Sequence, residues 1–185
     1  MFRSLLIAVA STALFASIAA ADAPHSLGKG HWSLGYEADS DPTIQFGIGI
    51  ADMTRIIASI AIENSDPGGT ASSTTAFGVS GEFRRYLSGM SSNYFSPFLG
   101  AGAGVTDTGI DGQDSNIDVF GGFGGEAFVV EPLSIGGFVG FGYTKHGDFT
   151  DPNDPNVTIP GEKTFGTLRS AITATLYWGS SNSPQ

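Results

Sequence analysis

The sequence has no cysteine and few basic residues. Without cysteine, disulfides, thiol catalysis and cysteine-ligated metal sites are all excluded. Only 8 Lys and Arg stand against 18 Asp and Glu. Because phosphate binding needs a basic surface, we expect no nucleic acid partner. The chain also lacks any convincing apolar repeat near 3.6 residues after its first 21 residues, which disfavours a helical fold.

The first residues have the pattern of a secretory signal. Arg3 is followed by an apolar run from Leu5 to Ala20 and by the small residues Ala19, Ala20 and Ala21. The run is too short for a transmembrane helix, so we predict a signal peptide over residues 1–21, cleaved after Ala21. Its removal leaves 7 bases against 18 acids, a net charge of −11. A polar leader over residues 22–29 follows.

Glycine is abundant, with 27 residues, and helices tolerate it poorly. Over residues 30–178, apolar and small or polar residues alternate in stretches of about ten, the pattern of membrane β-strands. In the second stretch, for example, Ile44, Phe46, Ile48 and Ile50 alternate with glycine and polar residues. We predict eight strands: His31–Ala38, Thr43–Ala51, Thr54–Glu63, Thr74–Tyr86, Tyr94–Val105, Ile117–Val129, Leu133–Thr144 and Thr164–Trp178.

The connections alternate in length. Those after the odd-numbered stretches are polar, acidic and mostly long, whereas those after the even-numbered stretches are mostly tight. Outer-membrane barrels have short periplasmic turns and longer outside loops. We therefore predict an all-β fold: an eight-stranded antiparallel up-and-down transmembrane β-barrel in a Gram-negative outer membrane. Its termini would both be periplasmic, and its first and last strands would pair.

The polar face distinguishes this prediction from a soluble periplasmic carrier of the lipocalin kind. It consists mostly of glycine and serine, which suits a narrow eight-stranded lumen that side chains largely fill. Its few charges are of both signs and should form ion pairs, because an unpaired buried charge is costly. We expect Arg84 or Arg169 to pair with Glu82 or Glu126. The candidates for lumen ion pairs are Arg55, Glu82, Arg84, Glu126 and Arg169.

Aromatic residues with a polar edge lie near the ends of the predicted strands. Such rings favour the two interfaces of a membrane, although aromatic residues are also common in ordinary strands. We predict that they form girdles at the membrane interfaces. They are Trp32, Tyr36, Tyr94, Tyr143 and Trp178.

Three segments resemble the small outer-membrane β-barrel family, which includes the barrel domain of outer membrane protein A and the opacity-type surface proteins. They are PFLGAGAGV (Pro97–Val105), GGFGGEAFV (Gly121–Val129) with EPLSIGGFVGFGY (Glu131–Tyr143), and TLRSAITATLYW (Thr167–Trp178). The resemblance implies the architecture but no activity. Family members commonly end on an aromatic residue, whereas here a polar tail, residues 179–185, follows Trp178. Either the tail is a periplasmic extension, or the insertion machinery recognises the last strand internally through Tyr177 and Trp178.

No catalytic, cofactor or metal site is expected. His146 is the one histidine on the predicted outer rim, where it could act as the base of a lipid A hydrolase. The acidic loops contain Asp107, Asp111, Asp114 and Asp118, and then Asp148, Asp151 and Asp154. Neither set has calcium-loop spacing, and the second is punctuated by proline, as turns are.

We therefore expect a non-enzymatic outer-membrane protein with an envelope-structural or surface-interaction role. The alternatives are a narrow pore, a lipid A-modifying enzyme and a soluble ligand carrier. The expected partners are outer-membrane lipid and lipopolysaccharide, with an unidentified host or surface ligand, and the barrel is expected to be a monomer.

Overall fold

The computed structural model describes residues 25–38, 42–65, 73–154 and 156–179. The side chains of His25, Ser65 and residues 167–169 are also outside the description. The predicted signal peptide, the first residues of the leader and most of the polar tail lie outside the described residues.

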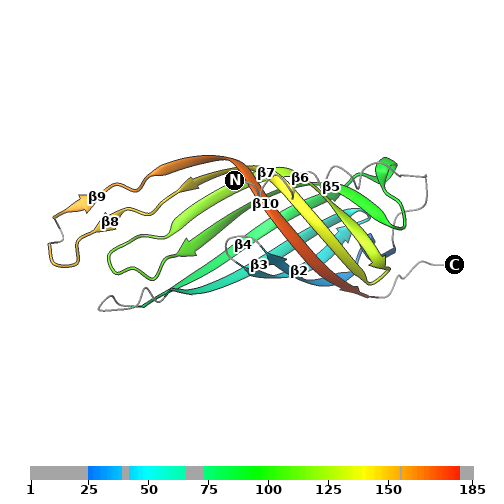
Figure 1. Cartoon of the computed structure of the whole chain (residues 1–185), viewed down its shortest axis with the longest axis horizontal. Coiled ribbons are helices and arrows are strands. Elements are labelled where there is room, and N and C mark those ends of the chain that lie inside the picture. The colour runs from blue at the N-terminus through cyan, green and yellow to red at the C-terminus, as the bar shows by residue number, and fades with distance from the viewer. Residues whose placement is uncertain (1–24, 39–41, 66–72, 155, 180–185) are drawn as a thin grey trace, which may run out of the picture.

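Eight long strands form one closed antiparallel barrel (Figure 1). Around the barrel the order is β1, β10, β7, β6, β5, β4, β3 and β2, so the first and last strands pair as predicted. Each observed boundary lies within two residues of its predicted position. The strands are β1 (Trp32–Ala38), β2 (Thr43–Ala51), β3 (Thr54–Ser65), β4 (Thr74–Tyr86), β5 (Phe95–Asp107), β6 (Asn116–Val130), β7 (Leu133–Lys145) and β10 (Lys163–Trp178).

The barrel has two unlike ends. We call the end with the long connections 108–115 and 146–162 the loop end, at the left of Figure 1. The opposite turn end carries the two-residue connections between β2 and β3 and between β6 and β7, and a short 3-10 helix, η3 (Ser88–Met90). The barrel wall begins and finishes at the turn end, where Trp32 of β1 pairs with Trp178 of β10.

A short hairpin extends the loop end beyond the barrel and was not predicted. It consists of β8 (Phe149–Thr150) and β9 (Thr158–Ile159). The neighbouring β5–β6 loop joins it, because Thr150 N donates to Gly112 O at 2.6 Å and Asp114 N donates to Asp148 O at 2.8 Å. Two-residue strands are too short for an alternating pattern to reveal them, which explains why the sequence predicts only turns here.

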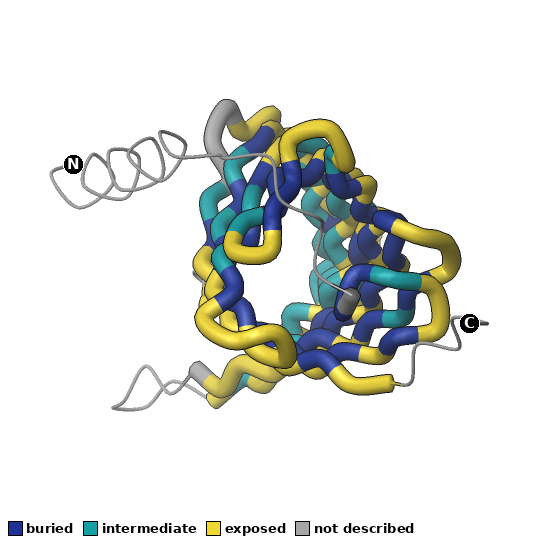
Figure 2. The backbone as a smooth tube through the Cα atoms, turned by 90° about the vertical axis from the view of Figure 1, so that its right-hand side faces the viewer, coloured by how far each residue is buried: buried dark blue, intermediate teal, exposed yellow. Residues whose placement is uncertain are grey.

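The faces of the barrel are inverted relative to a soluble protein. Buried and exposed residues alternate along the strands, as Figure 2 shows along the barrel from its turn end. The outward positions carry large apolar side chains that are about half exposed, such as Phe46 at 50%, Phe83 at 47% and Phe123 at 55%. The inward positions carry the buried charges. Exposing so continuous an apolar surface to water would be unfavourable, whereas contact between this surface and the hydrocarbon of a bilayer is favourable.

The described part of the chain contains no helix that is both long and apolar enough to cross a membrane.

Candidate functional site

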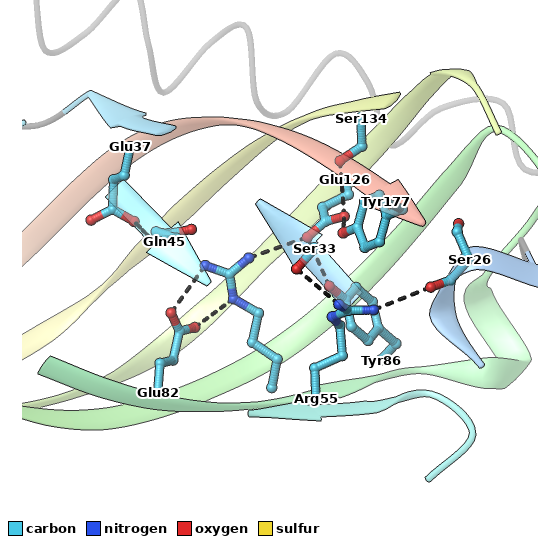
Figure 3. Close-up of polar contacts among 11 residues, drawn as sticks. Ser26, Ser33, Glu37, Gln45, Arg55, Glu82, Tyr86, Glu126, Ser134 and Tyr177 are labelled. Atoms are coloured by element: carbon cyan, nitrogen blue, oxygen red, sulfur yellow. Dashed lines mark hydrogen bonds and ion pairs between the residues drawn. The ribbon is translucent and has the colours of Figure 1, made fainter. Parts of the chain in front are cut away.

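Glu126, on β6, is the centre of a hydrogen-bonded network in the turn-end half of the lumen (Figure 3). Its side chain is only 1% exposed. Oε1 accepts from the Tyr86 hydroxyl at 2.7 Å and from Arg84 Nη1 at 3.1 Å. Oε2 accepts from Ser134 Oγ at 3.0 Å and from the Tyr177 hydroxyl. One carboxylate thus links four strands, β4, β6, β7 and β10, and its roughly four acceptor positions are all used.

Arg84 connects this carboxylate to a second one. Its Nε and Nη2 donate to the two oxygens of Glu82, at 2.7 and 3.0 Å, in the bidentate geometry that arginine and carboxylate favour. Nη1 donates to Glu126, so one guanidinium bridges two acids. The guanidinium carbon also lies 4.5 Å from the centre of the Phe98 ring, within cation–π range.

Glycines on β6 make room for the large inward side chains of this network. A Cβ atom on Gly124 would lie 2.5 Å from Cζ of Phe98, and one on Gly122 would lie 2.9 Å from Cζ of Phe138. Both distances are shorter than a real contact allows. The aromatic rings therefore lie directly against glycine backbone, which is how an eight-stranded barrel can hold arginine and phenylalanine together in its interior.

Arg55, on β3, holds the residues before β1 inside the turn-end mouth. Its Nη1 donates to Ser26 O at 3.1 Å, and its Nη2 donates to His31 O at 3.3 Å and to Ser33 Oγ at 2.8 Å. Its guanidinium carbon lies 4.7 Å from the centre of the Tyr177 ring, whose hydroxyl donates to the central carboxylate. The network therefore contains two arginines and two glutamates, so its formal charges cancel.

The residues before β1 include a short 3-10 helix, η2 (His25–Leu27), which lies in this mouth. Leu27 is fully buried, its carbonyl accepts from Met53 N at 3.1 Å, and Gly30 N donates to Gly49 O at 2.8 Å. Residues 26 and 27 of the predicted polar leader are buried, and burial of Leu27 among aromatic residues holds this segment in place; the leader itself, residues 22–29, stays a prediction. The apolar cluster around it consists of Leu27, Met53, Tyr86, Phe98, Phe128, Phe138 and Tyr177.

The loop-end half of the lumen is hollow. A cavity of about 520 Å³ lies there, which we call the cup. Its wall contains two carboxylates, Glu37 and Asp118, together with His146, Asn116 and seven hydroxyl residues, which are Thr43, Ser59, Ser80, Thr106, Thr144, Thr164 and Ser170. None of the residues of the charged network lines it. The expectation of a largely filled lumen therefore holds only for the turn-end half.

The wall around the cup is uneven in height. β1 and β2 have 7 and 9 residues, whereas β4 to β7 have 13 to 15. β1 pairs with β10 only from residue 172 onward, and the connection from β1 to β2 spans only residues 39–42. Glu37 of β1 and Thr43 of β2, on these two short strands, both line the cup.

His146 faces the cup and not the outer surface of the barrel. Its Nε2 lies 3.4 Å from Oγ1 of Thr164, which is a long contact, and its backbone N donates to Glu162 O. A lipid held in the bilayer outside would therefore have to enter the lumen to meet this imidazole. No serine hydroxyl is hydrogen-bonded to the imidazole among the described residues.

The loop aspartates stabilise turns. Asp151 Oδ1 accepts from Asn153 N at 2.8 Å, and Asp107 Oδ1 accepts from Gly109 N at 2.9 Å, the geometry of Asx turns. In the described ranges, no group of three or more histidine, aspartate and glutamate side chains is arranged to hold a metal ion.

The predicted site residues have distinct places. Glu82, Arg84 and Glu126 meet in the network, whereas Arg55 contacts hydroxyl and carbonyl groups instead of a carboxylate. Arg169 lies on β10 opposite Gly140, and its side chain is outside the described residues. The predicted girdle residues all point outward, from 38% exposed at Tyr143 to 76% at Tyr94; the others are Trp32, Tyr36 and Trp178.

A closed barrel with apolar residues outside and buried ion pairs inside has a transmembrane architecture. The chain folds as an eight-stranded transmembrane β-barrel. No protein-family model matches the sequence, and no curated protein matches it. Among solved structures, the crystal structure of Neisserial surface protein A is similar, with 14% sequence identity and a TM-score of 0.43. The match covers 80% of this chain and 92% of that one. The fold of this barrel is established by its own closed strand pairing.

Several residues of the lumen escape the sequence reasoning. Tyr86 and Tyr177 donate to Glu126 from strand ends, and their positions fit either an interface aromatic or a lumen residue. Phe98 and Phe138 point inward among glycines. For Phe138, a large residue flanked by Gly136 and Gly140 on the inward face was the available signal; Phe98 has Gly100 on one side and Ser96 on the other.

Proposed function

We propose that this protein is a non-enzymatic barrel of the bacterial outer membrane, anchored by its apolar outer face. Its short turns and both termini would face the periplasm, and its acidic loops would face outward, following the asymmetry of such barrels. The observation that carries the proposal is the combination of an apolar exterior with an interior occupied by ion pairs. A soluble carrier would expose this exterior to water, at a large cost.

The filled turn end argues against the alternative of a pore. The Glu126 network and the residues around Leu27 occupy the lumen from several strands, and each buried charge there has hydrogen-bond partners. Moving this network aside would separate buried charges, which costs several kcal/mol. In planar bilayers, the purified protein should show no discrete conductance steps. Regular single-channel steps would overturn the closed-lumen part of the proposal.

The location can be tested apart from the pore question. Cells expressing the full chain should contain the protein in the outer-membrane fraction, and its mobility on a detergent gel should change on boiling. External protease should cut the loop around Pro152 and Asn153, which are exposed turn residues. Recovery of the mature protein in the soluble periplasmic fraction would refute the proposal.

The non-enzymatic assignment has its own test, which uses His146. Lipid A from strains carrying the wild-type chain, the His146→Ala variant or a deletion should have the same mass spectrum. A mass change that is present with the wild-type chain and absent with the variant would instead establish the lipid A-modifying alternative.

We further propose that the barrel is a monomer whose surroundings are outer-membrane lipid and lipopolysaccharide.

A further inference from the structure

The cup has the size of a ligand site but a more polar lining. Its volume of about 520 Å³ falls in the range of small-molecule pockets. Its wall is rich in hydroxyl groups. Its apolar lining residues other than glycine are Ala61, Val79 and Val119, and the side chains of both valines are about half exposed on the outer face of the barrel. Small-molecule pockets are usually apolar, so a ligand for this wall has to be hydrophilic and able to form many hydrogen bonds.

The charges of the cup favour a cation. Glu37 and Asp118 line it, and neither lysine nor arginine is among its lining residues in the described part of the chain. Arg169 belongs to the same stretch of β10 as the lining residue Ser170. Even when the positive charge of Arg169 is counted, the two carboxylates leave a net formal charge of −1. Glu37 Oε2 accepts from Gln45 Nε2 at 2.7 Å, and a carboxylate has about four acceptor positions in all.

The surroundings of the cup strengthen this preference. At the loop end, the sequence places many acids and only Lys145 and Lys163 as lysines. Loops of one charge sign around a cavity raise the local concentration of the opposite charge.

We propose that the cup binds a small hydrophilic organic cation, with primary or secondary amine groups that donate to Asp118, Glu37 and the surrounding hydroxyls. Access is through the loop end. The proposal rests on the lumen geometry and not on the biological role argued above. A protein that proves to be a pore or an enzyme could still bind such a ligand.

Calorimetric titration of the refolded full-length protein in a neutral detergent, with spermidine as the probe, tests the proposal. We expect saturable binding at one site, weakened by salt. Maltose, which is neutral and hydroxyl-rich, should give no comparable signal. The Asp118→Asn variant should bind spermidine about tenfold more weakly, because it loses a charged hydrogen-bond acceptor. Asp111→Asn, a change at an exposed loop position outside the cup, should bind within about twofold of wild type.

A second pair of variants tests the cavity itself. A Cβ on Gly142 would meet its nearest atoms at 3.7 Å and 4.0 Å, so a leucine fits there and extends into the cup. A Cβ on Gly81 would meet no atom within 4 Å, and this outward position is exposed. Gly142→Leu should abolish saturable binding, while Gly81→Leu should leave it unchanged. Unaltered binding in Gly142→Leu, equal losses in Asp118→Asn and Asp111→Asn, or binding of maltose as tight as that of spermidine would each overturn the proposal.

Discussion

Replacement of Glu126 by glutamine should destabilise the barrel more than any exposed change of the same kind. The substitution removes the charge that faces Arg84 and replaces one acceptor oxygen by an NH₂ group. That group would face two of the four donors that now converge on the carboxylate. The hydroxyls of Ser134, Tyr86 and Tyr177 can rotate to accept, but a guanidinium cannot.

The magnitude follows from the burial of the pair. Side chains that are 1% and 2% exposed have almost no water to replace a lost partner, and removing one member of a buried pair costs about 3–5 kcal/mol. Arg84 keeps its two bonds to Glu82, and three of the four donors are hydroxyls. We therefore expect about 3 kcal/mol, the lower end of this range.

The assay is urea unfolding of the protein refolded into lipid vesicles, followed by tryptophan fluorescence. Both tryptophans, Trp32 and Trp178, are outward-facing, so the substitution leaves the probes unchanged. Glu131→Gln, in an exposed turn, is the matched control and should remain within about 0.5 kcal/mol of wild type. A Glu126→Gln variant within 1 kcal/mol of wild type, with an unaltered unfolding rate, would refute the role of the network.

Two further predictions concern the outer face and the turn-end mouth. Phe46→Lys, near the middle of β2, should lower the free energy of unfolding in bilayers by about 2–4 kcal/mol. Ile159→Lys, in the hairpin beyond the barrel, should change it little. Equal effects of the two substitutions would contradict lipid contact at Phe46. Gly49→Ala should displace the residues before β1, because its Cβ would lie 2.3 Å from Gly28 O, and trypsin should then cut after Lys29 faster than in wild type. Equal cleavage of the wild-type chain and Gly49→Ala would contradict a packed mouth.

The alternation of residue types predicts the barrel wall closely because lipid and lumen impose opposite chemistry on neighbouring residues. In β2, Ile44, Phe46 and Ile50 point outward and Gln45 and Gly47 point inward. One position of register error would place apolar residues inside and polar residues in lipid, so the pattern is strict.

The contents of the lumen are less predictable. Alternation shows that Glu82, Arg84 and Glu126 face inward, but their mutual distances depend on how the strands are staggered around the barrel. An inward glycine can either make room for a large side chain or leave part of the lumen hollow. Gly124 faces the ring of Phe98, whereas Gly142 lines the cup. Which of the two occurs depends on where other strands place their inward aromatic rings.

The mouth at the turn end is the clearest example of a long-range contact. Leu27 is a single apolar residue in a polar segment, with no periodicity to mark it, and it belongs to a buried cluster whose other members come from the β2–β3 turn, β4, β5, β6, β7 and β10. The β8–β9 hairpin cannot be predicted from the sequence for a different reason. Its strands have two residues each, and its order depends on bonds to the separate loop that contains Gly112 and Asp114.

The central claim is that the outward face of this barrel contacts lipid, whereas the inward face lines the lumen. Because the native chain has no cysteine, single cysteines can be introduced along β4 and labelled with a nitroxide. In bilayers, labels at positions 77, 79 and 83 should be reached by oxygen, which concentrates in lipid. Labels at positions 78 and 80, which line the cup, should be reached by a water-soluble nickel complex. Access of the nickel complex to positions 77, 79 and 83 equal to that at 78 and 80 would contradict the membrane-barrel account.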